Sequence, residues 1–396
     1  MINQQVIKSS NKKKMYTMIA EVPGISRAKL ASRAALSKTT VSVLVDELIQ
    51  EGYVLDKGAV ESKHQGRRPN SLVVNAKNNC VVVINWKART IQIAAVSAAF
   101  GVTALEEYTP MKDAEPVCQI AGIVNTFIQN HAEGQHILGV CIVIPGIIDE
   151  KNHRIISTVL GLGTDENMIF KLREAIDGYP LAIFNDTACL AYAENAFGNI
   201  DINNYVYLNI NEGVGASLIQ NGKILRGATG LGTQFGHFSI DRNGEPCSCG
   251  NRGCLENRIG EMVLAKRAKE CGALEEFDEQ PILFRDVSQL AEQGNPGALR
   301  LIYGLADDLA FSIGNLITMF HPDAIVIGGM GRKLGEIYLN RVTEQVKQVG
   351  FRQFVEDVEI HYTTLKEDSV FTGAAKYYLD THYDFMEDMG GTLFLY

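Results

Sequence analysis

One histidine and three cysteines lie in the short stretch from Gly236 to Glu256, and no other feature of the sequence constrains the fold as strongly. The cluster consists of His237, Cys247, Cys249 and Cys254. Zinc prefers tetrahedral nitrogen and sulfur ligands, and a set of three cysteines and one histidine leaves no open position for reactive water. Gly250 and Gly253 let the chain double back so that three sulfurs reach one ion. The spacing therefore predicts a structural zinc site.

A disulfide framework and ordinary core cysteines are the alternatives to a metal site. The segment 1–14 is polar and lacks the apolar core of a secretory signal, and no apolar run is long enough to cross a bilayer. Disulfides are rare in proteins that stay in a reducing compartment. We therefore expect zinc, a cytoplasmic location and no membrane insertion. The cysteines outside the cluster are dispersed along the chain: Cys80, Cys118, Cys141, Cys189 and Cys271.

The charge is distributed unevenly over the 396 residues, a length that suggests two or three domains. Residues 1–70 contain 12 Lys and Arg and six Asp and Glu, which gives a net charge of +6. The rest of the chain has 25 basic and 40 acidic residues, a net charge of −15. A basic head on an acidic body indicates a module that binds a polyanion. We expect a DNA-binding domain with a basic linker over residues 1–75 and a second domain over 76–396.

The basic head has the helix pattern of a helix-turn-helix module. Helices are expected over residues 12–19, 26–34 and 37–51, and Ser26 and Ser37 suit the capping positions of the last two. Residues 52–58 resemble the start of a wing hairpin. Side chains near the start of the third helix are placed to reach base edges and phosphates. The expected DNA contacts on this helix are Lys38, Thr39, Thr40 and Ser42.

Two arginines follow the head in the sequence Gly66-Arg67-Arg68-Pro69. The proline keeps the residue before it extended, and arginines suit the narrow, electronegative minor groove of A·T-rich DNA. A solvated linker with incidental charge is the alternative. Behind a helix-turn-helix, we expect Arg67 and Arg68 to contact DNA.

Strand-like apolar runs alternate with helical patterns from residue 78 onwards, which predicts an α/β body. The first two runs, over residues 80–84 and 91–96, suggest a hairpin. Further strands are expected over residues 137–144, 181–184, 205–210, 216–219 and 324–327. Helices are expected over residues 115–132, 190–197, 261–271 and 299–320.

A set of motifs in this body resembles the ROK family of bacterial sugar kinases and sugar-responsive repressors. In order, they are Ile144-Pro145-Gly146-Ile147-Ile148-Asp149, Phe184-Asn185-Asp186-Thr187, Gly213-Val214-Gly215, Gly236-His237 with the cysteines, and Ile327-Gly328-Gly329. The resemblance covers about residues 78 to 380 and implies a two-lobed, actin-like fold. The basic head is similar to the winged helix-turn-helix that repressors of this family carry.

The resemblance also implies a sugar site between the two lobes. The matching residues are Asn185, Asp186, Gln234, His237 and Glu256. Carboxylates and amides pair with sugar hydroxyls, and a metal on one nitrogen of His237 fixes its tautomer. Gln234 departs from the family, which usually has Glu there, so the identity of the sugar and sugar binding itself are open. A turn or a helix cap at a strand end is the alternative role for Asn185 and Asp186.

Kinase activity is the main alternative function, and it requires loops that bind ATP. ROK kinases open this domain with Asp-x-Gly-Gly-Thr, in which glycines admit phosphates and the aspartate helps to hold magnesium. The corresponding turn here is Asn85-Trp86-Lys87-Ala88-Arg89-Thr90, and the second phosphate loop reads Asn211-Glu212-Gly213-Val214-Gly215. Phosphoryl transfer depends on such positioning, so we expect that the chain is not an enzyme.

The sequence therefore predicts a sugar-responsive, DNA-binding transcriptional repressor of carbohydrate genes. Its expected partners are operator DNA, a sugar or sugar-phosphate inducer and further copies of itself, as a homodimer or tetramer. A sugar kinase is the second interpretation. The third is a repressor controlled by a protein partner, such as a sugar-transport component, with a vestigial sugar pocket.

Overall fold

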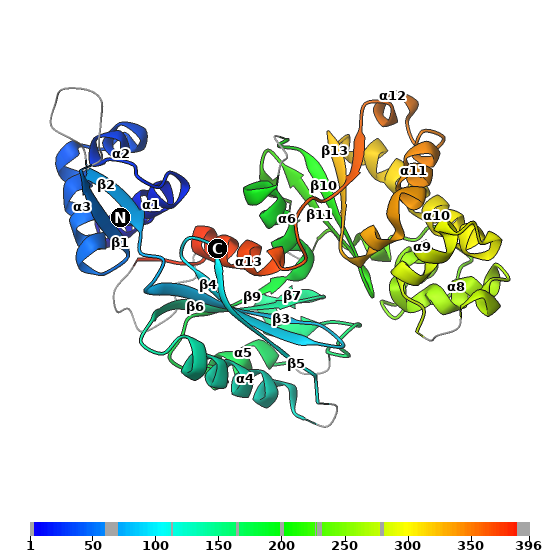
Figure 1. Ribbon diagram of the computed structural model, residues 1–396, viewed down its shortest axis with the longest axis horizontal. Coiled ribbons are helices and arrows are strands. Elements are labelled where there is room, and N and C mark those ends of the chain that lie inside the picture. Colours follow the sequence, from blue (N-terminus) through cyan, green and yellow to red (C-terminus); the bar gives the residue numbers. More distant parts are fainter. Residues whose placement is uncertain are drawn as a thin grey trace.

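The computed structural model describes residues 4–59, 70–111, 114–163, 166–198, 202–225, 227, 232–277 and 281–385. It contains the basic head and a body of two lobes, each built on a five-stranded sheet (Figure 1). Among these residues, no helix has the length and apolar character needed to span a membrane.

The head has three helices and a two-stranded sheet: α1 Gln4–Glu21, α2 Arg27–Ala34, α3 Lys38–Gln50, β1 Val54–Ala59 and β2 Asn70–Val74. Ser26 and Ser37 cap α2 and α3 as predicted, since each side chain accepts a backbone N–H three residues later. The first helix begins earlier than predicted. Within the added turns, Lys8 forms an ion pair with Glu47 of α3 at 2.8 Å, and further on the buried Lys12 forms an ion pair with Glu51 on the C-cap of α3.

Lobe I contains the sheet β5-β4-β3-β6-β9. Strand β3 pairs antiparallel with β4 and parallel with β6, so a hairpin is followed by crossover connections. The predicted hairpin is confirmed. The strands are β3 Asn79–Trp86, β4 Ile91–Ser97, β5 Val102–Tyr108, β6 His136–Ile144 and β9 Leu181–Asn185, with a small hairpin of β7 Ile147–Asp149 and β8 Arg154–Ile156. The helices are α4 Pro116–His131 and α5 Met168–Ala175.

Lobe II contains the sheet β12-β11-β10-β13-β14, which repeats the connectivity of lobe I: a meander, then two parallel strands. This repetition is the predicted two-lobed α/β body. The strands are β10 Tyr205–Ile210, β11 Val214–Gln220, β12 Lys223–Ile224, β13 Ala324–Gly328 and β14 Glu359–Tyr362. The helices are α7 Glu256–Ile259, α8 Leu264–Glu270, α9 Phe284–Glu292, α10 Pro296–Phe320, α11 Gly335–Val346 and α12 Arg352–Val355.

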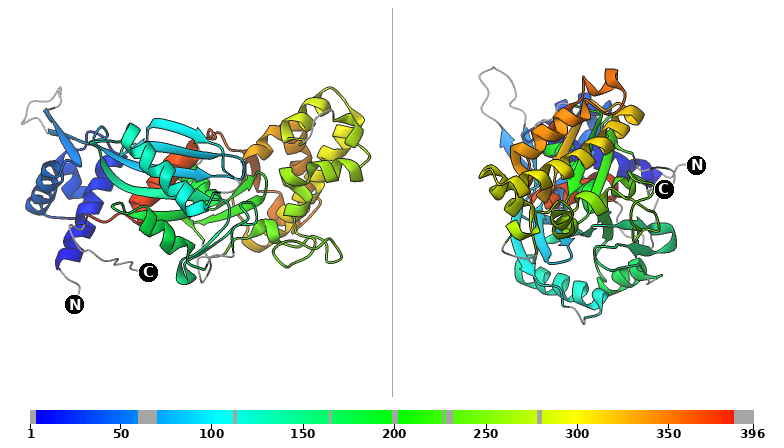
Figure 2. Two further views of the ribbon diagram at one scale, coloured as in Figure 1. Left: turned by 90° about the horizontal axis from the view of Figure 1, so that it is seen from below. Right: turned by 90° about the vertical axis from the view of Figure 1, so that its right-hand side faces the viewer.

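Two helices, α6 Asp186–Phe197 and α13 Ser369–Thr381, pack together between the lobes (Figures 1 and 2). We call them the central helix pair. The backbones approach closely at Gly373, where any side chain would collide with the carbonyl oxygen of Cys189. The Tyr192 hydroxyl of α6 also donates to Asp380 of α13 at 2.6 Å. The pair therefore joins the lobes as one packed unit.

Candidate effector, metal and DNA-binding sites

The four side chains of the predicted metal cluster come together in the folded chain. The ligand atoms of His237, Cys247, Cys249 and Cys254 all lie within 4.8 Å of one another. Sγ of Cys249 is 3.7 Å from Sγ of Cys254, and Nδ1 of His237 is 3.7 Å from Sγ of Cys247. Two sulfurs at about 2.3 Å from one tetrahedral ion lie roughly 3.8 Å apart. The donor set and its spacing therefore fit a four-coordinate metal ion.

Tight turns bring the thiols to one point. Gly250 and Gly253 have φ angles of 92° and 61°, and a Cβ on Gly253 would collide with the carbonyl oxygen of Asp241. The N–H of Gly250 donates to the carbonyl of Cys247 at 3.0 Å, which closes the turn after the first cysteine. Both glycines act as turn residues, as the sequence predicted.

Cys247 and Cys254 have shifted pKa values because the thiols of the cluster lie close together. Burial raises the pKa of Cys254, and the neighbouring Cys247 and Cys249 raise it further. Burial also raises the pKa of Cys247, but hydrogen bonds from Cys249, Cys254 and His237 outweigh it and lower this pKa to about 7. Metals bind cysteine as thiolate, and a divalent cation relieves the repulsion between clustered thiolates. The electrostatics of the cluster therefore also suit a bound cation.

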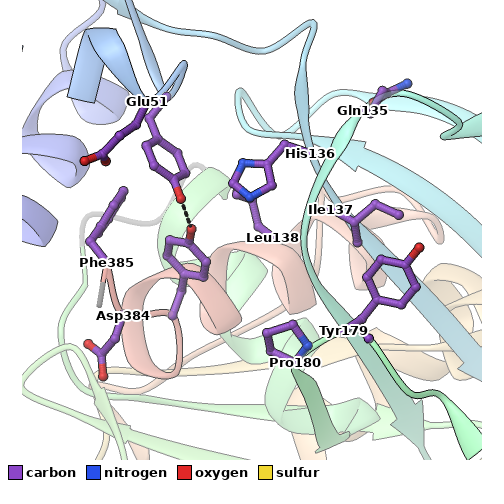
Figure 3. A pocket seen from close by; sticks show the side chains of 12 residues that line it. Glu51, Gln135, His136, Ile137, Leu138, Tyr179, Pro180, Asp384 and Phe385 are labelled. Atoms are coloured by element: carbon purple, nitrogen blue, oxygen red, sulfur yellow. Dashed lines mark hydrogen bonds between the residues drawn. The ribbon is translucent and has the colours of Figure 1, made fainter. Parts of the chain in front are cut away.

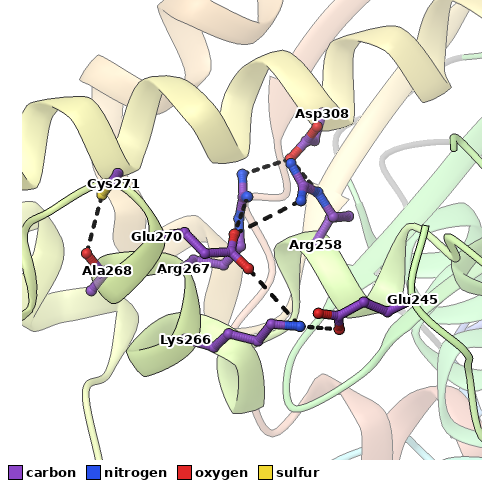
Figure 4. Close-up of polar contacts among 8 residues, drawn as sticks. All are labelled: Glu245, Arg258, Lys266, Arg267, Ala268, Glu270, Cys271 and Asp308. Carbon is purple, nitrogen blue, oxygen red and sulfur yellow. Dashed lines mark hydrogen bonds and ion pairs between the residues drawn. The ribbon is translucent and has the colours of Figure 1, made fainter. Parts of the chain in front are cut away.

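A network of ion pairs ties the segment 234–255, named the metal loop, to the helices of lobe II (Figure 4). Glu245 of the loop pairs with Lys266 on α8. Arg258 on α7 donates to Asp308 on α10 at 3.1 Å, and Arg267 on α8 donates to the same carboxylate at 2.7 Å. The side chains of Arg267 and Asp308 are 11% and 19% exposed, so solvent screens this pair less than a surface pair. The network holds the loop and α7 against α10.

Glu256 and Gly236, the residue before His237, both contact Val214, the first residue of β11. The backbone N–H of Val214 donates to Oε2 of Glu256 at 2.9 Å. Gly236, directly before His237, packs so closely on the carbonyl oxygen of Val214 that any side chain would collide. The metal loop and α7 are therefore both held at this strand end. Gln234 lies in the same loop with an exposed side chain.

The next residue of β11 connects this point to the central helix pair. Gly215 lies against the hydroxyl of Thr187, and a Cβ on this glycine would collide with it. Thr187 follows Asp186 at the start of α6. The first residues of β11 thus bring three distant segments together: the start of α6, the metal loop and α7.

The side chain of Asn185 has a structural role. Its Oδ1 accepts the N–H of Ala188 at 3.0 Å and so caps α6, and its Nδ2 donates to the carbonyl of Gly146 at 3.0 Å. These bonds are the helix cap that the sequence left open as an alternative. An amide has a second donor hydrogen and a second lone pair, so the cap leaves capacity for a ligand hydroxyl.

Asp186 is a hydrogen-bonded carboxylate at the start of α6. Its Oδ1 accepts the backbone N–H of Thr187 at 2.7 Å, and its Oδ2 accepts from Nδ2 of Asn209 at 3.0 Å. Burial raises the pKa of Asp186 to about 6, against the opposing effects of the Thr187 hydrogen bonds and the Lys87 charge. Asp186 is therefore ionised at neutral pH and able to accept a hydrogen bond from a ligand hydroxyl.

A small cleft of about 50 Å³ opens beside Asp186 between the lobes. Lys87 lines it from lobe I, Asn209 and Arg332 line it from lobe II, and residues 365–367 line it from the segment before α13. Of the five residues that the sequence predicts for the sugar site, Asp186 is the one that lines this cleft. Asn185, Gln234, His237 and Glu256 do not line it.

The turn that corresponds to the first phosphate loop of ROK kinases is shorter than the sequence predicted. Trp86 is not in the turn: it is the last residue of β3, pairs with Ile91 and is 6% exposed in the core of lobe I. The prediction that the turn includes Trp86 is therefore wrong, because Trp86 continues the alternation of core residues Val82 and Ile84 along β3. The turn consists of residues 87–90 and contains neither glycine nor a carboxylate.

The surface of the head that the sequence predicts to contact DNA lies at the start of α3. Lys38, Thr39 and Thr40 are exposed there, and Ser42 is half-buried. The hydroxyl of Thr40 lies 2.8 Å from that of Ser37, so Thr40 takes part in the helix cap. Arg67 and Arg68 lie outside the described residues.

Val43 on α3 is a further candidate DNA contact, which reasoning from the sequence missed. Its side chain is 51% exposed, beside the buried stripe of this helix. The signal was present, because an apolar residue off the buried stripe of a recognition helix is suited to contact a thymine methyl group.

Two family models match the chain. The model described as "ROK family" matches residues 82–381, and the model described as "Winged helix-turn-helix DNA-binding" matches residues 9–54. A protein named "Xylose repressor" from Caldicellulosiruptor bescii is 30% identical, over 94% of this chain and 96% of that protein.

Solved structures share the fold. A ROK family transcriptional regulator, described as a homologue of the Escherichia coli Mlc protein, matches with a TM-score of 0.80 at 22% identity, over 93% of this chain and 95% of that one. A ROK family glucokinase from Streptomyces griseus, in complex with glucose and AMPPNP, matches with a TM-score of 0.62 at 20% identity. It covers 75% of this chain and 98% of its own.

Proposed function

The chain belongs to the ROK family, and on that premise we propose that it is a sugar-responsive transcriptional repressor that acts on DNA in the cytoplasm. The observation that carries the proposal is the exposed polar surface of α3 on a winged helix-turn-helix head, joined to a ROK body. The similarity to a xylose repressor extends over nearly the whole of both chains and supports the same conclusion. We divide the chain into a DNA-binding domain over residues 1–75 and a ROK domain over residues 76–396.

The head is proposed to bind operator DNA through Lys38, Thr39, Thr40 and Ser42, with Arg67 and Arg68 in the adjacent minor groove. Helix-turn-helix proteins commonly bind paired half-sites as dimers, so a homodimer or a pair of dimers is the proposed assembly. Repressed genes would be those of carbohydrate uptake and metabolism, in keeping with the name of the relative.

The proposed inducer is a monosaccharide or its phosphate, and D-xylose is the first candidate because of that same relative. The proposed contacts are Asn185, Asp186, Gln234, His237 and Glu256. The effector can alter DNA affinity only if it binds two arrangements of the molecule unequally. Closure of the lobes around the sugar is the proposed change, because the start of β11 already holds the metal loop and α7 close to α6.

The metal cluster is proposed to hold one structural zinc ion through His237, Cys247, Cys249 and Cys254. The 3.7 Å separations and the closed donor set support zinc rather than a catalytic ion. When bound, the ion fixes the orientation of His237 and so leaves its second ring nitrogen for a hydroxyl group.

A sugar kinase is the second candidate, since the ROK glucokinase shares the fold of the body. The turn over residues 87–90 lacks the glycines that admit phosphates, and Glu212 adds negative charge to the second loop. We therefore propose that the chain is not an enzyme. Control by a protein partner such as a sugar-transport component remains the third candidate, because Gln234 departs from the family.

Operator binding with and without sugar tests the proposal. The full chain selects its preferred duplex from a random DNA pool, and its affinity for that duplex is then measured with D-xylose, D-glucose, N-acetylglucosamine and their phosphates. A repressor releases the duplex with one of them, while a kinase consumes ATP in a parallel assay. Selection of no duplex contradicts the DNA-binding function, and release by none of the sugars favours the protein-partner candidate.

A further inference from the structure

The end of the described chain returns to the head and forms an aromatic cluster with it (Figure 3). The ring of Phe385 lies 4.9 Å from that of Tyr53 and 5.1 Å from that of Tyr16. The Tyr383 hydroxyl donates to the Tyr53 hydroxyl at 2.8 Å, and the ring of His136 on β6 lies 5.3 Å from Tyr53. These five residues are named the head–body joint.

A cavity of about 650 Å³ lies beside the joint. Glu51 and Tyr53 line it from the head, residues 135–138 and 178–180 line it from lobe I, and residues 383–385 line it from the chain end. The head is therefore packed on the joint at one side and faces open space at the other. A change in its tilt requires movement at the joint, because the head, lobe I and α13 share one hydrophobic core.

Helix α13 extends from the interlobe cleft to this joint. Residues 365–367 before the helix, and Val370 in its first turn, line the cleft that contains Asp186. The helix ends at Thr381, and Tyr383 and Phe385 follow directly. Its 13 residues span about 20 Å as one rigid element.

The central helix pair links α13 to the proposed effector contact. Asp186 is the first residue of α6, and α6 packs on α13 without a gap where Gly373 meets Cys189. One turn further on, Tyr192 donates to Asp380, which also accepts from Lys376. A close-packed contact passes on a displacement that a loose contact would absorb. Movement of α6 therefore moves α13.

We propose that α13 transmits effector binding to the DNA-binding head and that Tyr53 and Tyr383 are positioning residues of this connection. The inference rests on the proposed repressor function. Their hydroxyl bond spans the two domains and holds the head in one tilt. Displacement of α13 breaks or strains this bond, and the head then presents α3 differently to DNA.

Removal of single hydroxyl groups tests the connection. The variants are Tyr53→Phe, Tyr383→Phe and the double variant, each in the full chain. The control is Tyr362→Phe, which loses a 2.8 Å hydroxyl bond to the carbonyl of Gly335 within lobe II. Affinity for the selected duplex is measured with and without D-xylose, and affinity for D-xylose is measured without DNA.

Each joint variant is expected to lower the fold-change in DNA affinity caused by D-xylose by about fivefold, the effect of one ordinary hydrogen bond. The double variant should lose no more than either single variant, because both remove the same bond. D-xylose binding without DNA and the response of Tyr362→Phe should remain. A full response in the joint variants, or an equal loss in the control, overturns the proposal.

A measurement without sugar separates this proposal from the proposed function. If no sugar changes the DNA affinity of the unmodified chain, the sugar-responsive function fails, and calorimetric unfolding of Phe385→Ala then decides the role of the joint. A functional joint makes the head and lobe I unfold together in the unmodified chain and separately in this variant. A single shared transition in both proteins overturns the joint.

Discussion

At the scale of single residues, two neighbours at the start of α6 have different roles. Asn185 stabilises the helix, and Asp186 is available to a ligand. Asn185 uses both ends of its amide to cap the helix and to hold Gly146. Asp186 accepts hydrogen bonds from Thr187 and Asn209, and burial raises its pKa to about 6. Asn185 therefore keeps Asp186 in place at the cleft, and the carboxylate is the better target for a test of ligand binding.

Substitution of Asp186 by alanine should remove the response to sugar and leave affinity for DNA unchanged. Loss of a charged hydrogen-bond partner in a buried site costs about 2–3 kcal/mol, which corresponds to a 30- to 150-fold loss of ligand affinity. The variant should behave as a repressor that sugar cannot release. Sugar titrations of the DNA complex measure this, and release of the variant at the same sugar concentration contradicts the assignment.

The raised pKa of Asp186 gives the sugar response a pH dependence. The carboxylate is ionised above pH of about 6 and protonated below it, so its ability to accept a hydroxyl proton declines as the pH falls through 6. Sugar affinity should decline over the same interval. The contribution of Asp186 to folding stability should instead rise as the pH falls, because its pKa is higher in the folded state than in the unfolded state. Calorimetric titrations between pH 5 and 8 test the prediction, and Asp186→Asn should lack this step.

The metal cluster gives a prediction for single cysteines. Replacement of Cys247, Cys249 or Cys254 by serine leaves an incomplete tetrahedral set, so each variant should lose most of its zinc. Cys271→Ser is the matched control, because this thiol lies outside the cluster. Elemental analysis of freshly purified protein measures the content. Zinc-free unmodified protein contradicts the assignment of the site.

The sequence predicted the residues of the metal cluster because their chemistry depends on local spacing. It left open whether Asn185 caps a helix or binds a ligand, since both roles suit an amide at the end of a strand. It also missed the contact between Tyr53 and Tyr383, which are separated by 330 positions. Pairings of that kind arise from packing and leave no local pattern.

At the scale of elements, the predicted helices with clear caps were found, whereas an edge strand and a long buried helix were missed. Ser37 caps α3 and the stripe of Val41, Leu44, Val45 and Leu48 is buried, so the pattern determines this helix. Strand β5 alternates between exposed and half-buried residues, because it lies at the edge of its sheet, and carries little apolar signal. Helix α13 was missed as well, although it connects the two cavities.

Substitutions on α3 test the role of this helix in DNA binding. Lys38→Ala should weaken binding to all duplexes and reduce its dependence on salt, because it removes a phosphate contact. Thr39→Ala should instead reduce discrimination between duplexes. Lys269→Ala on α8 is the matched control for charge. Binding measured against salt and against altered duplexes distinguishes these effects, and unchanged binding in both variants contradicts the assigned surface.

At the scale of the whole molecule, the two lobes repeat one connectivity but have separate hydrophobic cores. One core joins residues of the head, such as Leu48, to residues of lobe I and α13, such as Val81 and Phe371. Another belongs to lobe II and includes Leu255 and Ile259 next to the metal loop. Loss of the metal should therefore destabilise lobe II before the rest of the molecule.

A chelator that removes the metal should lower the unfolding temperature of lobe II and leave that of the head and lobe I nearly unchanged. Binding to DNA in the absence of sugar should persist, while release by sugar should be lost because His237 is no longer fixed. Scanning calorimetry with parallel DNA titrations measures both effects. Loss of DNA binding in proportion to metal removal would show that the metal also supports the head.

Trp86 gives the molecule an optical property. It is the single tryptophan of the chain, it is buried at the end of β3, and the next residue lines the interlobe cleft. All indole emission therefore comes from one site in the core of lobe I. The colour and lifetime of the emission follow the local polarity, so the unfolding of lobe I can be observed separately from that of lobe II without an attached dye.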